Sequence, residues 1–156
     1  MTHQLLVNID VDDLEKAVEF YSRGLGLTAR RRLGPDAIEM LGAGCAIYLL
    51  MKPTGTRPFI RAGAGRRYRR HWTPVHLDLA VPDLRAALDQ ALAAGAKLEG
   101  RVAERRWGSM ARMADPFGHG FCLLQFKGRG YDEIVEAPPR PARARRQPVR
   151  ARRRSG

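Results

Sequence analysis

A histidine and an aspartate stand two residues apart in the segment 76–80, where polar and apolar residues alternate. Alternation predicts a β-strand, and residues two apart on a strand point to the same face. A carboxylate beside an imidazole orients the ring and raises its basicity, which is the arrangement of a general base. We therefore predict His76 and Asp78 as the candidate catalytic pair. The plainer alternative is a polar contact that only stabilises the strand, and such contacts are the commoner arrangement.

Four further side chains carry groups that contact ligands, and we predict them as ligand-binding: Asn8, Tyr48, Trp107 and Cys122. The amide and the phenol offer hydrogen bonds, and the indole offers a flat face to a planar ligand. The thiol of Cys122 is a nucleophile only where its pKa is lowered. Its apolar neighbours in the sequence favour simple packing instead.

An internal repeat supplies the elements that position these residues. The segment 7–14 reappears 70 residues later as 77–84, and each copy runs into an amphipathic helical pattern. The first strand is predicted over 5–11, with Asp12 capping the first helix and Glu15 completing a capping box. Asp83 marks the start of the second helix, and Gly95 marks its end. A repeat of this length predicts two similar modules with a natural ligand cleft between them.

Shorter apolar runs follow each predicted helix and are typical of strands. They cover residues 28–32, 37–41 and 45–51 in the first half, and 97–102, 109–114 and 120–126 in the second. Each half therefore has the order strand-helix-strand-strand-strand, which predicts an α+β fold. The expected domain is 1–136, with module one at about 1–53, a connector at 54–73 and module two at 74–127. The arginines of the connector are predicted to lie in a solvated loop.

Three stretches resemble the vicinal oxygen chelate superfamily, which includes glyoxalase I, bleomycin-resistance proteins and extradiol dioxygenases. They are 5–27 with Phe20-Tyr21 and Gly24-Leu25-Gly26-Leu27, 76–84, and 107–122 with Asp115-Pro116-Phe117-Gly118-His119-Gly120. The resemblance implies two tandem βαβββ modules whose mixed β-sheets curve into a cup with flanking helices. It also implies that the concave face, with the predicted site residues on it, binds a small organic molecule.

Metal-dependent members of that superfamily carry ligands at four equivalent positions, which correspond here to Leu6, Tyr48, His76 and Cys122. A leucine cannot ligate, and a neutral tyrosine is a poor ligand for the metals concerned. Two donors fall short of the three protein ligands of a catalytic zinc site. We therefore predict a metal-independent binding protein without a cofactor. The alternatives are a metal-dependent lyase or dioxygenase with relocated ligands, and a polyanion-binding protein; whether any reaction is catalysed stays open.

The basic charge of the chain is concentrated at one end. The formal net charge is +12, and the eight arginines of 137–156, a stretch without acids, leave only +4 on residues 1–136. This Pro- and Arg-rich tail is predicted to be disordered and to contact polyanions nonspecifically. Two lone cysteines and the lack of a signal-peptide or membrane-span pattern predict a soluble cytoplasmic protein. The resemblance implies a homodimer.

Overall fold

The structure is a computed structural model that describes residues 3–135. Module one contains β1 (Leu6–Val11), α1 (Leu14–Arg23), β2 (Thr28–Arg32), β3 (Ala37–Leu41) and β4 (Ala46–Met51). Module two contains β5 (Leu77–Ala80), α2 (Leu84–Ala93), β6 (Lys97–Leu98), β7 (Ala103–Arg105), β8 (Gly108–Ala114), β9 (Gly120–Phe126) and the short 3-10 helix η1 (Gly130–Ile134). The predicted α+β fold of two tandem modules is confirmed. The Arg-rich tail lies outside the described residues.

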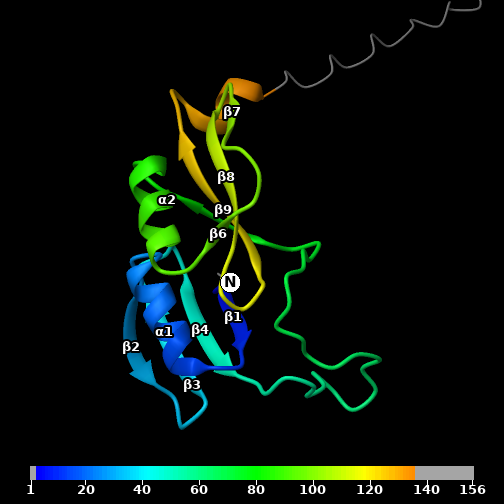
Figure 1. The fold of residues 1–156 in the computed structure, drawn as a ribbon. Helices are drawn as coiled ribbons and strands as arrows, with labels where there is room; N and C mark the ends of the chain where they lie inside the picture. The colour runs from blue at the N-terminus through cyan, green and yellow to red at the C-terminus, as the bar shows by residue number, and fades with distance from the viewer. Residues whose placement is uncertain (1–2, 136–156) are drawn as a thin grey trace, which may run out of the picture.

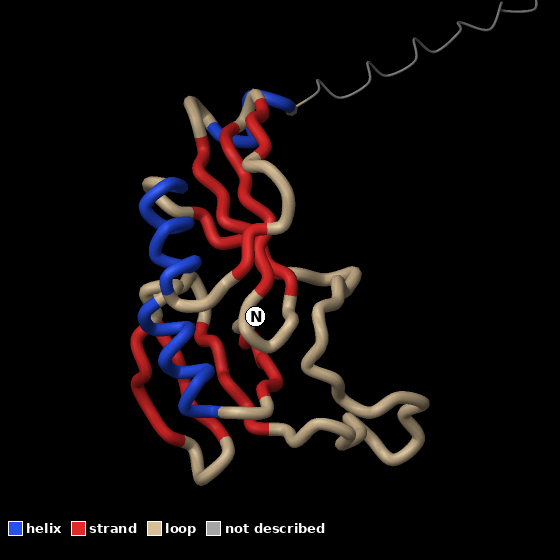
Figure 2. The backbone as a smooth tube through the Cα atoms, viewed as in Figure 1, coloured by secondary structure: helices blue, strands red, loops and turns tan. Residues whose placement is uncertain are grey.

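Each module folds its strands into one open mixed sheet. The first sheet has the order β1-β4-β3-β2, and the second has β5-β9-β8-β6 with β7 paired to β8. The first and last strands of each module pair in parallel, and the other neighbouring strands pair antiparallel. The strands β1 and β5 therefore lie at sheet edges. Both helices lie along one side of the molecule and contact each other, and the connector lies on the other side (Figures 1 and 2).

The core lies between the sheets and the helices, because alternate strand residues face α1 and α2. On β1, Ile9 and Val11 are buried, whereas Leu6 is 47% exposed and Asn8 is exposed. The opposite sheet faces carry no α-helix among the described residues, and the predicted site residues of β1, β4, β5 and β9 lie on these faces, which we call helix-free because neither α1 nor α2 covers them. No helix in the described part of the chain is long and apolar enough to cross a membrane.

Two details of the prediction were wrong. The N-cap of α1 is Asp13, not Asp12: its side chain accepts a hydrogen bond from the Lys16 amide at 3.0 Å. This position fits the packing, because it places Leu14 at the first helical position, where it is buried. The strand expected over 97–102 is the short β6, since the chain turns away at Gly100, and β7 forms beyond it.

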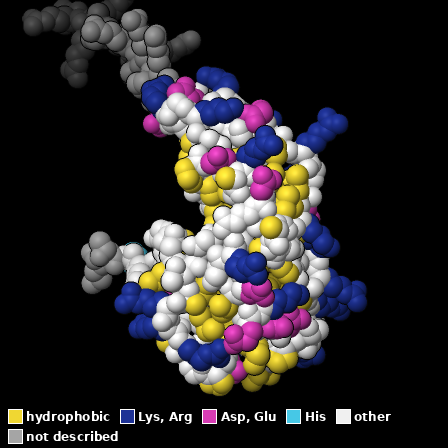
Figure 3. Space-filling view, turned by 60° about the vertical axis from the view of Figure 1, so that its left-hand side comes forward, with side chains coloured by type: hydrophobic (Ala, Val, Ile, Leu, Met, Phe, Trp, Pro, Cys, Tyr) yellow, Lys and Arg dark blue, Asp and Glu magenta, His cyan; other side chains and the backbone are white. Residues whose placement is uncertain are grey.

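Lysine and arginine side chains are interspersed with acidic ones over the helix-covered side of the molecule (Figure 3). That side therefore presents no field of one sign, as the modest charge of residues 1–136 predicts.

Candidate functional site

A cavity of about 500 Å³ lies where the edge strands β1 and β5 of the two modules approach each other. Residues of β1, α1, β4, the connector, β5 and β9 line it, so both modules contribute. Most of its wall is apolar, and the polar residues of the wall are Asn8, Asp10, Tyr21, His71, Thr73, His76 and His119. A concave, largely apolar site with a few polar groups is the usual form of a small-molecule site.

The predicted site residues divide between this cavity and its surroundings. Asn8 and His76 line the cavity, whereas Asp78, Tyr48, Cys122 and Trp107 do not. Their roles as catalytic or ligand-binding residues stay predictions, and their positions in the structure show which groups each one contacts.

Tyr48 belongs to a hydrogen-bonded row on the helix-free face of module one. It pairs in register with Asn8 on one side and Glu39 on the other, and its hydroxyl donates to the Glu39 carboxylate at 3.1 Å. Arg31 holds the same carboxylate with two hydrogen bonds of 2.7 Å. The hydrogen bonds from Arg31 lower the pKa of Glu39, and the hydrogen bond to Glu39 raises the pKa of Tyr48. The hydrogen of the Tyr48 hydroxyl is therefore already used in the bond to Glu39.

His76, Asp78 and Cys122 lie together on the helix-free face of module two. The Nε2 atom of His76 is 3.2 Å from the Asp78 carboxylate, and Asp78 pairs in register with Cys122. Burial, followed by the charge of Asp78, raises the pKa of the Cys122 thiol to about 11. A thiol with this pKa is protonated near neutral pH, so the raised pKa argues against Cys122 as a nucleophile.

The metal positions implied by the resemblance are a poor fit, because Leu6 offers no donor atom and the Tyr48 hydroxyl is bonded to Glu39. A different set of donors does meet: ligand atoms of His76, Asp78 and Cys122 all lie within 4.8 Å of one another. Imidazole, carboxylate and thiolate are all zinc ligands, and three of them are enough for a catalytic zinc site. Only two metal ligands, His76 and Cys122, were expected from the sequence, because Asp78 was not among the positions that the resemblance implied.

Trp107 packs in an aromatic cluster at the far end of module two. Its ring centroid lies 6.0 Å from that of Phe126 and 5.1 Å from that of Tyr131. This cluster joins the end of β9 to η1 and takes no part in the cavity wall.

Two cavity residues that sequence reasoning did not assign to the site join the modules. The Tyr21 hydroxyl of α1 donates to Asp115 of module two at 2.8 Å, and the Nε2 atom of His119 lies 2.8 Å from the carbonyl oxygen of Asp10 on β1. The same Asp115 carboxylate accepts the backbone N–H groups of Phe117 and His119 and so shapes the turn. Burial, with a contribution from Asp115, raises the pKa of Tyr21 well above its usual value.

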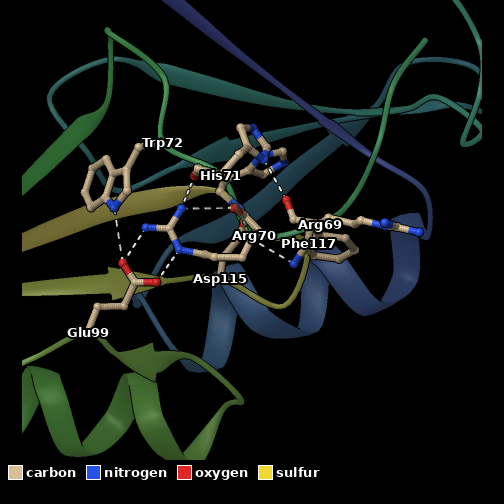
Figure 4. Close-up of polar contacts among 9 residues, drawn as sticks. Arg69, Arg70, His71, Trp72, Glu99, Asp115 and Phe117 are labelled. Atoms are coloured by element: carbon tan, nitrogen blue, oxygen red, sulfur yellow. Dashed lines mark hydrogen bonds and ion pairs between the residues drawn. The ribbon is translucent and has the colours of Figure 1, made fainter. Parts of the chain in front are cut away.

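The connector 54–73, called the strap below, is mostly exposed, as expected of a solvated loop, but two of its arginines hold it to both modules. Arg66 donates to Asp10 of module one at 2.6 Å, and Arg70 forms a two-pronged ion pair with Glu99 of module two. Figure 4 shows Glu99 held by Arg70 and by the indole N–H of Trp72, which donates at 3.2 Å. The sequence alone predicts that both arginines are solvated and unpaired. Their ion pairs hold the strap so that residues from 71–76 line the cavity.

The profile of the glyoxalase-like domain matches residues 6–124, which cover both modules. The chain belongs to the glyoxalase-like family. This confirms the predicted membership of the vicinal oxygen chelate superfamily. A relative described as an uncharacterized protein of Mycobacterium bovis is 30% identical over an alignment of 132 positions, and the match covers 81% of this chain and 86% of that protein.

Solved structures of this glyoxalase-like type share the fold. A glyoxalase-related enzyme from Fulvimarina pelagi aligns with a TM-score of 0.63 at 19% identity, covering 80% of this chain and 88% of that one. A fosfomycin resistance protein from Listeria monocytogenes aligns with a TM-score of 0.63 at 16% identity, covering 86% of this chain and 99% of that one. An antibiotic binding protein from a Streptomyces species aligns with a TM-score of 0.57 at 23% identity, covering 81% of this chain and 98% of that one. At these identities the likeness establishes the fold alone.

Proposed function

We propose that this glyoxalase-like protein binds a small organic molecule in the cavity between its two modules, without a metal. The observation that carries the proposal is the cavity itself, which is large enough for a drug-sized ligand and is mostly apolar. Two similar solved structures are described as a fosfomycin resistance protein and an antibiotic binding protein, which suits a binding or resistance role. The two free cysteines suit the reducing cytoplasm in which we place this function.

A thermal-shift screen against a panel of metabolites and antibiotics, with and without divalent metals, tests this proposal. A ligand that binds only the folded state stabilises it by RT ln(1 + L/Kd), where L is the free ligand concentration, and so raises the midpoint of unfolding. Thr73→Trp places a large side chain in the cavity wall, so it should abolish the shift of any hit. Thr28→Trp is the matched control, because Thr28 is exposed on β2 outside the cavity. Hits that survive Thr73→Trp would place the binding elsewhere.

One observation favours a second candidate, a metal-dependent enzyme of the same superfamily. The donor set of His76, Asp78 and Cys122 could hold zinc, and a bound zinc ion supplies a Lewis acid. Metal analysis of protein purified without an affinity tag separates the two candidates. The metal-free proposal expects no stoichiometric metal. About one equivalent that is lost in Asp78→Asn and in Cys122→Ser would establish the second candidate.

We also propose that two copies pair through the helix-free sheet faces. No α-helix among residues 3–135 covers these faces, and they expose apolar side chains such as Leu6 at 47% and Phe126 at 41%. Light scattering after size exclusion should give twice the mass of the chain. Leu6→Asp should shift the mass to that of one chain, whereas Leu92→Asp, at an exposed position on α2, should not.

A further inference from the structure

The cavity gathers three of the four histidines of the chain, and all three have one ring nitrogen beside an oxygen that accepts hydrogen bonds. The Nδ1 atom of His71 lies 2.7 Å from the carbonyl oxygen of Arg69. The Nε2 atom of His119 lies 2.8 Å from the carbonyl oxygen of Asp10. The Nε2 atom of His76 faces the Asp78 carboxylate.

The two contacts with carbonyl oxygens determine which ring nitrogen carries the N–H group. A carbonyl oxygen has no hydrogen to give, so the ring nitrogen that it contacts must be the donor. A neutral imidazole carries only one N–H group, and its other nitrogen is then an acceptor. The acceptors are therefore Nε2 of His71 and Nδ1 of His119. The rings of these two residues lie 5.5 Å apart, centroid to centroid, so they form one acceptor pair.

Both acceptor nitrogens are left for a ligand. Neither has a hydrogen-bond partner within residues 3–135. Among the described residues that are buried or half-buried, every side-chain nitrogen or oxygen that solvent cannot reach has a hydrogen-bond partner. His119 is half-buried and its Nδ1 atom has no partner, so solvent must reach this atom. An open acceptor on a cavity wall is a binding group for a donor.

The charges around the cavity disfavour an anionic ligand. Its wall contains no lysine or arginine and does contain Asp10. Two strap arginines are paired, Arg66 with Asp10 and Arg70 with Glu99. Arg67 and Arg69 belong to the lining of a separate pocket and not to this wall. A carboxylate or phosphate would enter without a cation in the wall to receive it.

We propose that the cavity selects a mainly apolar, uncharged ligand that carries hydroxyl or N–H donors, and that it recognises these donors through His71 and His119. The inference rests on the proposed binding function and names the chemical class of its ligand. The apolar walls supply the bulk of the contact, and the two imidazoles supply the selectivity, because a ligand without donors would cover these acceptors and leave them unpaired, which is costly.

Three naphthalenes of similar size test this selectivity by calorimetry at pH 7.5: 1-naphthol, which donates, 1-methoxynaphthalene, which only accepts, and 1-naphthoate, which is an anion. We expect naphthol to bind at least about tenfold more tightly than either analogue, since one hydrogen bond in a desolvated site has about this value. His71→Phe should reduce the ratio of naphthol to methoxynaphthalene toward one. His3→Phe is the control, because His3 is exposed and lies outside the cavity wall.

The outcomes separate this inference from the function on which it rests. Equal binding of all three compounds would contradict the donor preference and leave the cavity as a ligand site. Tighter binding of naphthoate would also contradict it, because the rings would then act as cations. A preference for naphthol that persists in both His71→Phe and His119→Phe would remove the assignment to these residues. Failure of all three compounds to bind would contradict the inferred ligand class, and the proposed function would fail with it only if the thermal-shift screen also gave no hit that Thr73→Trp abolishes.

Discussion

The Tyr21 hydroxyl in module one donates a hydrogen bond of 2.8 Å to the carboxylate of Asp115 in module two, across 94 positions of sequence. Asp115 also accepts the backbone N–H groups of Phe117 and His119, and His119 reaches back to Asp10 on β1. One buried carboxylate thus fixes the turn before β9 and ties it to the helix of the other module. The cavity depends on this connection, because Tyr21 and His119 both line it.

Removal of the Tyr21 hydroxyl should therefore destabilise the whole domain. Tyr21→Phe leaves the buried Asp115 carboxylate short of one donor, which costs about 1–3 kcal/mol. Urea unfolding followed by circular dichroism measures the loss. Tyr131→Phe is the control and should change the unfolding free energy by less than about 0.5 kcal/mol, because Tyr131 is 48% exposed. An equal effect of the two substitutions would contradict the role of the Tyr21–Asp115 contact.

The Cys122 thiol should resist alkylation until the solution is strongly alkaline. Its pKa is raised from 9.0 to about 11, first by burial and then by Asp78, so the thiolate forms late. In Cys45→Ser protein, the rate of reaction with iodoacetamide should be low at about pH 8 and rise toward pH 11. Asp78→Asn removes a negative charge and should move this rise to lower pH, whereas Asp89→Asn on the exposed side of α2 should not.

The same shift predicts the sign of the alkaline stability change. The folded protein favours the protonated thiol, so this group leaves the unfolding free energy unchanged below about pH 9, the ordinary pKa, and lowers it as the pH rises toward about 11. Tyr68, whose pKa burial raises to about 12, acts in the same direction at still higher pH. A rise in stability over this range would contradict both assignments.

Gly120 should be intolerant of a methyl group because of Trp72. A Cβ atom at Gly120 would lie 2.8 Å from the indole ring, so Gly120→Ala must displace the strap. We expect a loss of about 1–3 kcal/mol in stability and a change in tryptophan fluorescence. In a Trp72→Ala background, Gly120→Ala should cost little. Gly44→Ala is the control, because nothing lies within 4 Å of a Cβ atom there. Equal costs in both backgrounds would exclude the clash.

The fold was predictable because its information is local. The alternation of apolar and polar residues on β1 and the apolar stripe from Leu14 to Tyr21 on α1 both recur in module two. Alternation predicts a strand, and a stripe at helical spacing predicts a helix. The cap of α1 was misplaced by one residue because Asp12 and Asp13 are adjacent and both can cap a helix. The two-residue strand β6 is too short to show a period at all.

The site was predictable only in part, because its contacts are long-range. His76 and Asp78 share a strand, so alternation alone brings them together. Tyr21 is indistinguishable in the sequence from a core residue of α1, and the bond from His119 to Asp10 spans 109 positions. The connector has no hydrophobic period, so nothing in it showed that Arg70 would find Glu99. The glycines on both sides of His119 were the available signal, since they let the strap approach the turn closely.

Truncation after Glu136 should separate polyanion binding from the rest of the protein. The segment removed carries eight of the 28 cationic residues and no acid, so the net charge falls from +12 to +4. Each cation that contacts a polyanion releases counterions, and the truncated protein should elute from heparin at much lower salt with a smaller salt dependence. The melting temperature and the binding of any ligand found in the screen should stay the same. A full-length variant with the eight arginines changed to glutamine keeps the length constant and should behave like the truncation. Heparin retention that survives in both proteins would assign polyanion binding to residues 1–136, and unfolding of the truncated chain would show that the tail belongs to the domain.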